Sequence, residues 1–415
     1  MTADARHVAI AKGPSTWLTS IGTIEPREIW NFSALVVAQI VVALVGLAST
    51  RYLSPSDKGL FTAAYLWALV GQTIVGLSLP NALLFYGAAE GRARPSRHVI
   101  TILGSASLLC GMALAFFVSV HAPDHLLLEM VLLPLPTAML AFEVSTYSAL
   151  AQGRPFYGYR LAQGLVFAGV GVPTLLITHN VTVLTAALLL SYVVSVLITL
   201  GSPRSAAATS PLRLGVRQLL QWSLRGHAGL TLSLLATRLD ILFVTLLLST
   251  FVAGQYAAAA ALPNLLAYSG TAMGLTLARR ATVHSGRKTP GFAGWWGAVL
   301  FVGNALIATI LIVIRNPLIT GLFGAPYAPS TAILIPLAVA LPFWSLAAYE
   351  AQVLASVGRP IHQTIGQGIA SLVLGIGSAY GVAHQNVQFV AWSNVAAYSC
   401  SVVWQSAALS LSRRR

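Results

Sequence analysis

Twelve apolar stretches, each about the length of a membrane-spanning helix, constrain the fold of this chain more than any other feature. They lie at 30–50, 60–86, 98–120, 126–150, 160–178, 181–201, 226–249, 254–278, 292–314, 331–356, 362–383 and 388–411. A helix needs about 17–25 mainly apolar residues to cross a hydrocarbon layer ~30 Å thick. Only 8% of residues are charged, whereas soluble domains carry about 25%. The sequence predicts an all-α, polytopic membrane protein in contact with the lipid bilayer.

The basic residues predict the orientation of the spans, because cytoplasmic loops of membrane proteins carry an excess of Lys and Arg. If the N-terminus is cytoplasmic, 20 of the 24 basic residues fall in cytoplasmic segments. Arg51, Lys58 and Arg315 fall in outer loops, and Arg238 lies inside a span. We therefore expect both termini in the cytoplasm. The net charge of +14 then reports topology, and we expect no nucleic-acid partner.

The order of spans and linkers predicts two lobes. We expect a cytoplasmic N-terminal tail (1–29), an N-lobe of spans 1–6 (30–201), a cytoplasmic linker with an amphipathic helix (202–225), a C-lobe of spans 7–12 (226–411) and a basic C-terminal tail (412–415). "GRP" occurs at 153–155 and 358–360, and "LSPSDKGLFTAA" (53–64) aligns with "LSTFVAGQYAAA" (248–259) at Leu-Ser and Gly. Such parallel repeats are related by an axis along the membrane normal. The prediction is two pseudo-symmetric six-helix lobes.

Arg238 and Asp240 lie near the middle of the seventh span. A charge there costs roughly 2.5–3.5 kcal/mol on insertion scales. Two residues are ~200° apart around a helix, so the two side chains cannot face one direction. At least one of them must face another helix or a hydrated cavity.

Two segments resemble a known family. "TRYLSPSDKGLFTAAYLWALVGQTIVGLSLPNALLFYGA" (50–88) resembles the opening of bacterial polysaccharide flippases of the O-antigen transporter type, with Arg51, Leu53, Pro55 and Gly59 in its loop. "ATRLDILFVTLLLSTFVAGQYAAA" (236–259) resembles the second-half opening of these proteins, which has an Asp in the seventh span, here Asp240, followed by Gly-x-Tyr.

This resemblance implies membership of the superfamily that also contains lipid II flippases and multidrug and toxin extrusion antiporters. It implies two lobes around a central cavity that opens alternately to each side of a bacterial cytoplasmic membrane. The implied cargo is an anionic lipid-linked glycan, an undecaprenyl-diphosphate oligosaccharide. Glycan polymerase or export machinery is the implied partner, and no cofactor is expected.

The substrate-cavity candidates are Arg238, Asp240, Arg51 and Asn81. Arg suits a diphosphate because its guanidinium stays charged and binds oxygens in pairs. The alternatives are that Arg238 and Asp240 tie the seventh span to its neighbours, that Arg51 extends to the membrane interface, and that Asn81 belongs to a packing kink after Pro80.

Three intramembrane carboxylates are candidates for coupling transport to a proton or sodium gradient: Asp240, Glu143 and Glu350. Carboxylates within spans often mark ion pathways. The alternative is that each is paired with an Arg and stabilises the fold, or lies close enough to the interface to be hydrated.

The sequence contains no phosphate-binding loop and no His/Cys/carboxylate spacing typical of a metal site, so we expect neither an enzyme nor a metal. One rival function is a cation-coupled multidrug antiporter of the same superfamily. A second is a membrane-embedded glycan polymerase or glycosyltransferase, although such enzymes usually have long outer loops, and the longest here is "RNPLITGLFGAPYAPS". A third is a scaffold without transport.

Overall fold

The computed structural model describes residues 26–80, 97–121, 126–151, 156–201, 216–284, 292–357 and 359–413, and every regular element in them is helical. The helices are α1 (Pro26–Tyr52), α2 (Pro55–Gly76), α4 (Arg97–His121), α5 (Leu126–Leu132), α6 (Leu135–Ala151), α7 (Phe156–Thr178), α8 (Val181–Gly201), α9 (Val216–Leu247), α10 (Thr250–His284), α11 (Phe292–Val313), α12 (Arg315–Phe323), the 3₁₀ turn η3 (Ala325–Tyr327), α13 (Ser330–Ser356), α14 (Pro360–Ala383) and α15 (Val387–Arg413). The prediction of an all-α polytopic membrane protein is confirmed.

Each of the twelve predicted spans corresponds to a helix or a pair of helices. In the part of the chain that the structure describes, nine segments are long and apolar enough to cross a membrane. The three predicted spans outside this set are α1, α10 and α15. In α10, packing against other helices permits small residues, such as the alanines from Ala257 to Ala260, which are all buried.

Two predicted spans are interrupted. The second span was expected to run through to 86 with a bend at Pro80, but α2 ends at Gly76 and Leu77 adopts a left-handed conformation with φ 44°. The fourth span is split into α5 and α6 at Leu133 and Pro134. A proline lacks the amide hydrogen that a helix interior requires, which accounts for the second interruption.

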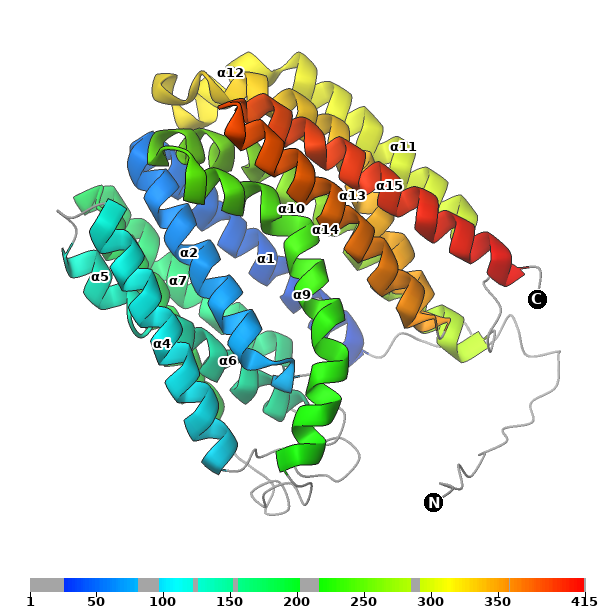
Figure 1. The fold of residues 1–415 in the computed structure, drawn as a ribbon, viewed down its shortest axis with the longest axis horizontal. Helices are drawn as coiled ribbons and strands as arrows, with labels where there is room; N and C mark the ends of the chain where they lie inside the picture. The colour runs from blue at the N-terminus through cyan, green and yellow to red at the C-terminus, as the bar shows by residue number, and fades with distance from the viewer. Residues whose placement is uncertain are drawn as a thin grey trace.

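The helices form the two predicted lobes (Figure 1). In the N-terminal half, α1 packs on α7, α7 on α8, and α2 on α4 and α6. In the C-terminal half, α10 and α15 pack on α13, and α9 packs on α14. The lobes meet where α1 and α2 contact α10 and α12, and they diverge toward the opposite end of the molecule (Figure 1).

The contact between α2 and α10 is reciprocal. A Cβ atom on Gly59 would lie 1.8 Å from the backbone oxygen of Thr250, and one on Gly254 would lie 1.7 Å from that of Pro55. In the alignment of 53–64 with 248–259, Gly59 corresponds to Gly254 and Pro55 to Thr250. Each repeat therefore offers the same surface to the other, as a two-fold axis between them requires. Only glycine at both positions permits so close an approach of the two helices.

The structure differs from the predicted linker (202–225) in one respect. Residues 216–225 do not form a separate surface helix, because α9 begins at Val216 and continues without a break to Leu247. Residues 202–215, the tail up to residue 25 and residues 414–415 lie outside the described residues. The long α9 results from the absence of Pro or Ser/Ala-rich sequence between 216 and 247.

Candidate functional site

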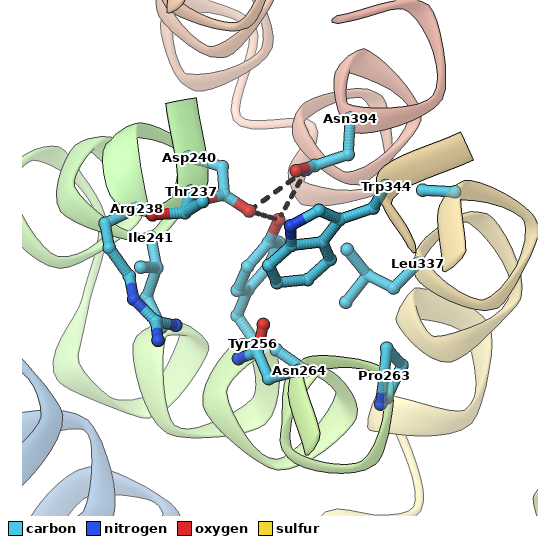
Figure 2. A pocket seen from close by; sticks show the side chains of 12 residues that line it. Thr237, Arg238, Asp240, Ile241, Tyr256, Pro263, Asn264, Leu337, Trp344 and Asn394 are labelled. Carbon is cyan, nitrogen blue, oxygen red and sulfur yellow. Dashed lines mark hydrogen bonds between the residues drawn. The ribbon is translucent and has the colours of Figure 1, made fainter. Parts of the chain in front are cut away.

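Asp240 is the buried centre of a hydrogen-bonded group that joins three helices (Figure 2). Its carboxylate, on α9, accepts a hydrogen bond from the Tyr256 hydroxyl on α10 and one from the Asn394 amide on α15 at 3.0 Å. The Asn394 amide also lies 3.2 Å from the Tyr256 hydroxyl. A buried carboxylate is costly unless it is hydrogen-bonded, and these two donors meet that need. Asp240 therefore ties the seventh span to two neighbours, as one sequence-based alternative proposed.

Arg238 extends away from Asp240 on a different side of α9 (Figure 2). Its side chain is half-buried. Among the described residues, no hydrogen bond or ion pair to its guanidinium is found. The idea that Arg238, like Asp240, ties helices together through a polar pair thus has no support in the described part of the chain.

Arg238 lines a cavity of about 220 Å³ inside the C-terminal half, between α9, α10, α13, α14 and α15. A smaller cavity of about 20 Å³ lies next to it and is lined by Asp240, Tyr256 and Asn394. Four residues line both cavities: Thr237, Arg238, Asn264 and Trp344. Arg238 therefore stands at the junction between the larger cavity and the buried Asp240 group.

The larger cavity carries positive charge only. Arg238 is the one charged residue among the side chains that line it, and the others are amides, hydroxyls, aromatic rings and small apolar groups. A guanidinium in an environment of low dielectric constant attracts anions strongly, and its planar fork matches phosphate oxygens. The chemistry of this cavity therefore suits an anionic group such as a phosphate.

Solved structures with the same arrangement of helices are membrane transporters. The lipid II flippase MurJ in an inward closed conformation matches with a TM-score of 0.71 and 13% identity, covering 92% of this chain and 87% of that chain. An inward-facing MATE family transporter of the MOP superfamily matches with a TM-score of 0.61 and 15% identity, covering 91% and 96%. The Vibrio cholerae MATE transporter VcmN in its bent form matches with 0.59 and 14%, covering 95% and 99%.

No family model matches the sequence, and no curated protein is similar to it in sequence. The chain shares the fold of these transporters. This likeness agrees with the predicted all-α fold of about twelve spans. At these identities the likeness concerns the fold alone.

Of the two other cavity candidates, only Arg51 is described by the structure, and it lies apart from both cavities. Arg51, at the end of α1, donates a hydrogen bond from Nη1 to the backbone oxygen of Gly321 in α12, at 3.5 Å. It lines neither cavity. Asn81 lies outside the described residues. Of the four predicted cavity residues, the structure thus brings Arg238 and Asp240 together around the same pair of cavities.

The other two coupling candidates do not belong to the hydrogen-bonded group of Asp240. Glu143 of α6 forms an ion pair with Arg160 of α7, with 2.6 Å between Oε2 and Nη2. Glu350 of α13 is 6% exposed and accepts a hydrogen bond from the Ser406 hydroxyl at 2.6 Å. Its Oε2 has no hydrogen-bond partner among the described residues. Glu143 thus fits the structural alternative, and Glu350 is a buried carboxyl group with one uncompensated oxygen.

Sequence reasoning missed most of the polar residues of the site. Tyr256 was noted only as part of a motif, and Asn394 was not singled out. Gln363 and Gln367, which line the larger cavity, had a detectable signal, because residues four apart in a span share one helix face. Gln352 had none, since a single polar residue in a span does not show which direction it faces.

Proposed function

We propose that the protein is a flippase that moves a lipid-linked oligosaccharide, a polysaccharide precursor, from the cytoplasmic to the outer leaflet of a bacterial cytoplasmic membrane. The supporting observation is Arg238, which lines an interior cavity without an ion partner among the described residues and without any carboxylate in the lining of the larger cavity. Arg238 binds the diphosphate of the cargo, and the lipid tail stays in the bilayer. Alternating access of the two lobes carries the headgroup across.

The charge of the cavity favours this proposal over a cation-coupled multidrug antiporter. A cationic drug needs an anionic group in its site, and it would meet the positive charge of Arg238 in the larger cavity. A glycan polymerase or glycosyltransferase has less support still. The described residues hold no group of three His, Cys, Asp or Glu side chains that could bind a metal ion, and the connections that they include between spans are short.

Asp240 is the carboxylate best placed to couple this movement to a proton or sodium gradient. It is buried, it lines the smaller cavity next to Arg238, and its hydrogen bonds come from neutral groups on α10 and α15, so no basic side chain neutralises it among the described residues. Glu143 is already neutralised by Arg160. Glu350 is a second candidate, at a different position between α13 and α15.

The proposed flippase has both termini in the cytoplasm, in accord with the distribution of Lys and Arg. In this orientation the turn between α13 and α14 faces the cytoplasm, where the cargo is assembled before transfer. Polymerase or export machinery would take the cargo on the outer side. Cysteine-accessibility labelling of the turn at 357–359 in intact and permeabilised cells tests the orientation.

The decisive experiment is mass spectrometry of polyprenyl-diphosphate glycans extracted from a strain that lacks the gene. We expect one complete lipid-linked repeat unit to accumulate, and the wild-type gene to reverse the accumulation. Arg238→Ala should fail to reverse it at normal membrane abundance. Arg315→Ala is the matched control, because Arg315 donates to the backbone oxygen of Ile312 and lines neither cavity. An unchanged lipid profile in the deletion strain would refute the flippase and favour the drug antiporter.

A further inference from the structure

The larger cavity is lined by one charged side chain and by several neutral side chains that can form hydrogen bonds. Four side-chain amides line it: Asn264 of α10, Gln352 of α13, and Gln363 and Gln367 of α14. All four side chains are half-buried. None has a hydrogen-bond partner among the described residues, in contrast to the buried amides of Gln255 and Asn394. The cavity thus holds four amide groups whose donors and acceptors are available to a ligand.

The fold gathers the three glutamines at one end of the C-terminal half, and Asn264 lies at the junction of the two cavities. Gln363 and Gln367 are four residues apart near the start of α14, so they share one face of that helix. Gln352 lies near the end of α13, directly before the short turn that joins the two helices. Gly274 of α10 allows a close approach here, because a Cβ atom on it would lie 2.7 Å from the Cβ of Gln352. The amides therefore surround one space instead of being scattered along the lobe.

The chemistry of the amides defines the ligand. An amide both donates and accepts hydrogen bonds, which matches a hydroxyl group that does the same. A lipid tail in this cavity would leave the amides without partners after displacing water, which is unfavourable. A cationic ligand would find no carboxylate in the lining. The lining thus fits a neutral, hydroxyl-rich group such as a sugar ring.

Aromatic rings complete one wall of the cavity. The rings of Trp344 and Tyr398 both line it and stack on each other, with centroids 5.2 Å apart and an interplanar angle of 5°. The Tyr398 hydroxyl donates to the backbone oxygen of Ala236 at 2.8 Å, which holds the stack in place. A rigid apolar wall opposite converging polar groups is typical of small-molecule sites. It suits the apolar C–H face of a sugar ring.

We propose that this cavity is a sugar subsite, which holds the sugar attached directly to the diphosphate of the cargo. Arg238, at the junction of the two cavities, binds the diphosphate, and Asn264, Gln352, Gln363 and Gln367 bind the hydroxyl groups of the adjoining sugar. Arg238 and the glutamines thus lie next to each other along the cavity, as the diphosphate and the first sugar do in the cargo. The inference rests on the proposed function, and it adds that the protein selects its cargo by that first sugar.

Binding of short-chain analogues to the full-length protein in nanodiscs tests the subsite. The probes are farnesyl diphosphate, farnesyl-diphospho-glucose and farnesyl-diphospho-N-acetylglucosamine, and isothermal titration calorimetry gives each Kd. We expect at least one sugar-bearing probe to bind about tenfold more tightly than farnesyl diphosphate, since a few net hydrogen bonds to neutral groups supply that difference. Gln363→Leu/Gln367→Leu should remove the gain. Asn264→Leu, on another helix, should also reduce the gain in affinity from the sugar. This variant provides the test if the double variant does not fold.

Gln388→Leu is the matched control, because Gln388 is an exposed glutamine of α15 that does not line the cavity. It should keep the full gain from the sugar. Equal affinities for all three probes, or a gain that survives in both amide variants, would overturn the sugar subsite alone. Failure of farnesyl diphosphate to bind, or binding that Arg238→Gln leaves unchanged, would instead contradict the proposed function, and the inference with it.

Discussion

Arg238 and Asp240 are separated by one residue on α9, yet the structure gives them different surroundings. Asp240 is held by Tyr256 and Asn394, whereas Arg238 points away from them on another side of α9 (Figure 2). Arg238 also lines the larger cavity. Two opposite charges in contact would neutralise each other and leave neither available. Their angular separation on the helix keeps the Asp240 carboxylate in its hydrogen-bonded group and leaves the Arg238 guanidinium in the lining of the cavities.

Asp240→Asn should abolish stabilisation of the protein by the coupling cation. We expect the thermal unfolding temperature of the wild type to rise in sodium chloride relative to choline chloride. The asparagine variant keeps the shape of the side chain but lacks the charge that binds the cation. Differential scanning fluorimetry measures the unfolding temperature. Glu129→Gln, outside both cavities, is the control, and an Asp240→Asn variant with the wild-type response would exclude Asp240 as the coupling site.

Gly59→Leu or Gly254→Leu should hold the lobes apart at the end where α2 meets α10. A Cβ atom at Gly59 would already lie 1.8 Å from a backbone oxygen, so the helices must separate. Transport requires this end to close as well as open, and we expect both variants to be inactive but inserted normally. Spin labels at Ser56 and Phe251 in a cysteine-free background should report a longer distance than in the parent protein.

Gly46→Ala provides the control for this pair, because a Cβ atom there would meet no other atom within 4 Å. We expect it to transport normally and to keep the short label distance. An active Gly59→Leu protein with an unchanged label distance would show that the reciprocal glycine contact is not needed for the transport cycle.

The ion pair between Glu143 and Arg160 should stabilise the fold and not couple transport. The side chains are 23% and 26% exposed, respectively, so the loss of one partner leaves a partly buried charge. We expect Glu143→Gln and Arg160→Gln each to lower stability, and the double variant to lower it by less than the sum, with a coupling energy of ~0.5–3 kcal/mol. Unfolding of the four proteins in detergent completes the cycle. Additive effects, or loss of ion dependence in the double variant, would contradict this role.

Glu350→Gln should leave stability unchanged or raise it. Glu350 Oε2 is buried without a partner in the described part of the chain, so a neutral side chain of the same shape avoids the cost of a buried charge. Ser406→Ala should lower stability by ~1 kcal/mol, because it removes the hydrogen bond to Oε1. Thermal unfolding distinguishes the two. If Glu350→Gln is the more destabilising variant, a group other than Ser406 compensates the carboxylate.

The helices, their approximate ends and the two lobes were predictable, because hydropathy over about twenty residues and the period of the helix are local properties. The matching of "LSPSDKGLFTAA" with "LSTFVAGQYAAA" correctly paired Gly59 with Gly254, although it did not show that the two residues touch. The break after Gly76 was missed, because Leu77 in a left-handed conformation has no signal of the kind that a proline gives. The continuation of α9 into residues 216–225 was missed because an amphipathic segment can equally begin a span.

The sequence by itself determined that Arg238 and Asp240 are intramembrane charges that face different directions, because two residues on a helix are ~200° apart. Only the tertiary structure decided which direction each takes. The partners of Asp240 are 16 and 154 residues away along the chain, on α10 and α15. Glu143 and Glu350 are alike in sequence, but packing places an arginine beside the first and a serine beside the second. Such pairings depend on how whole helices pack in three dimensions, and no local pattern of residues records that.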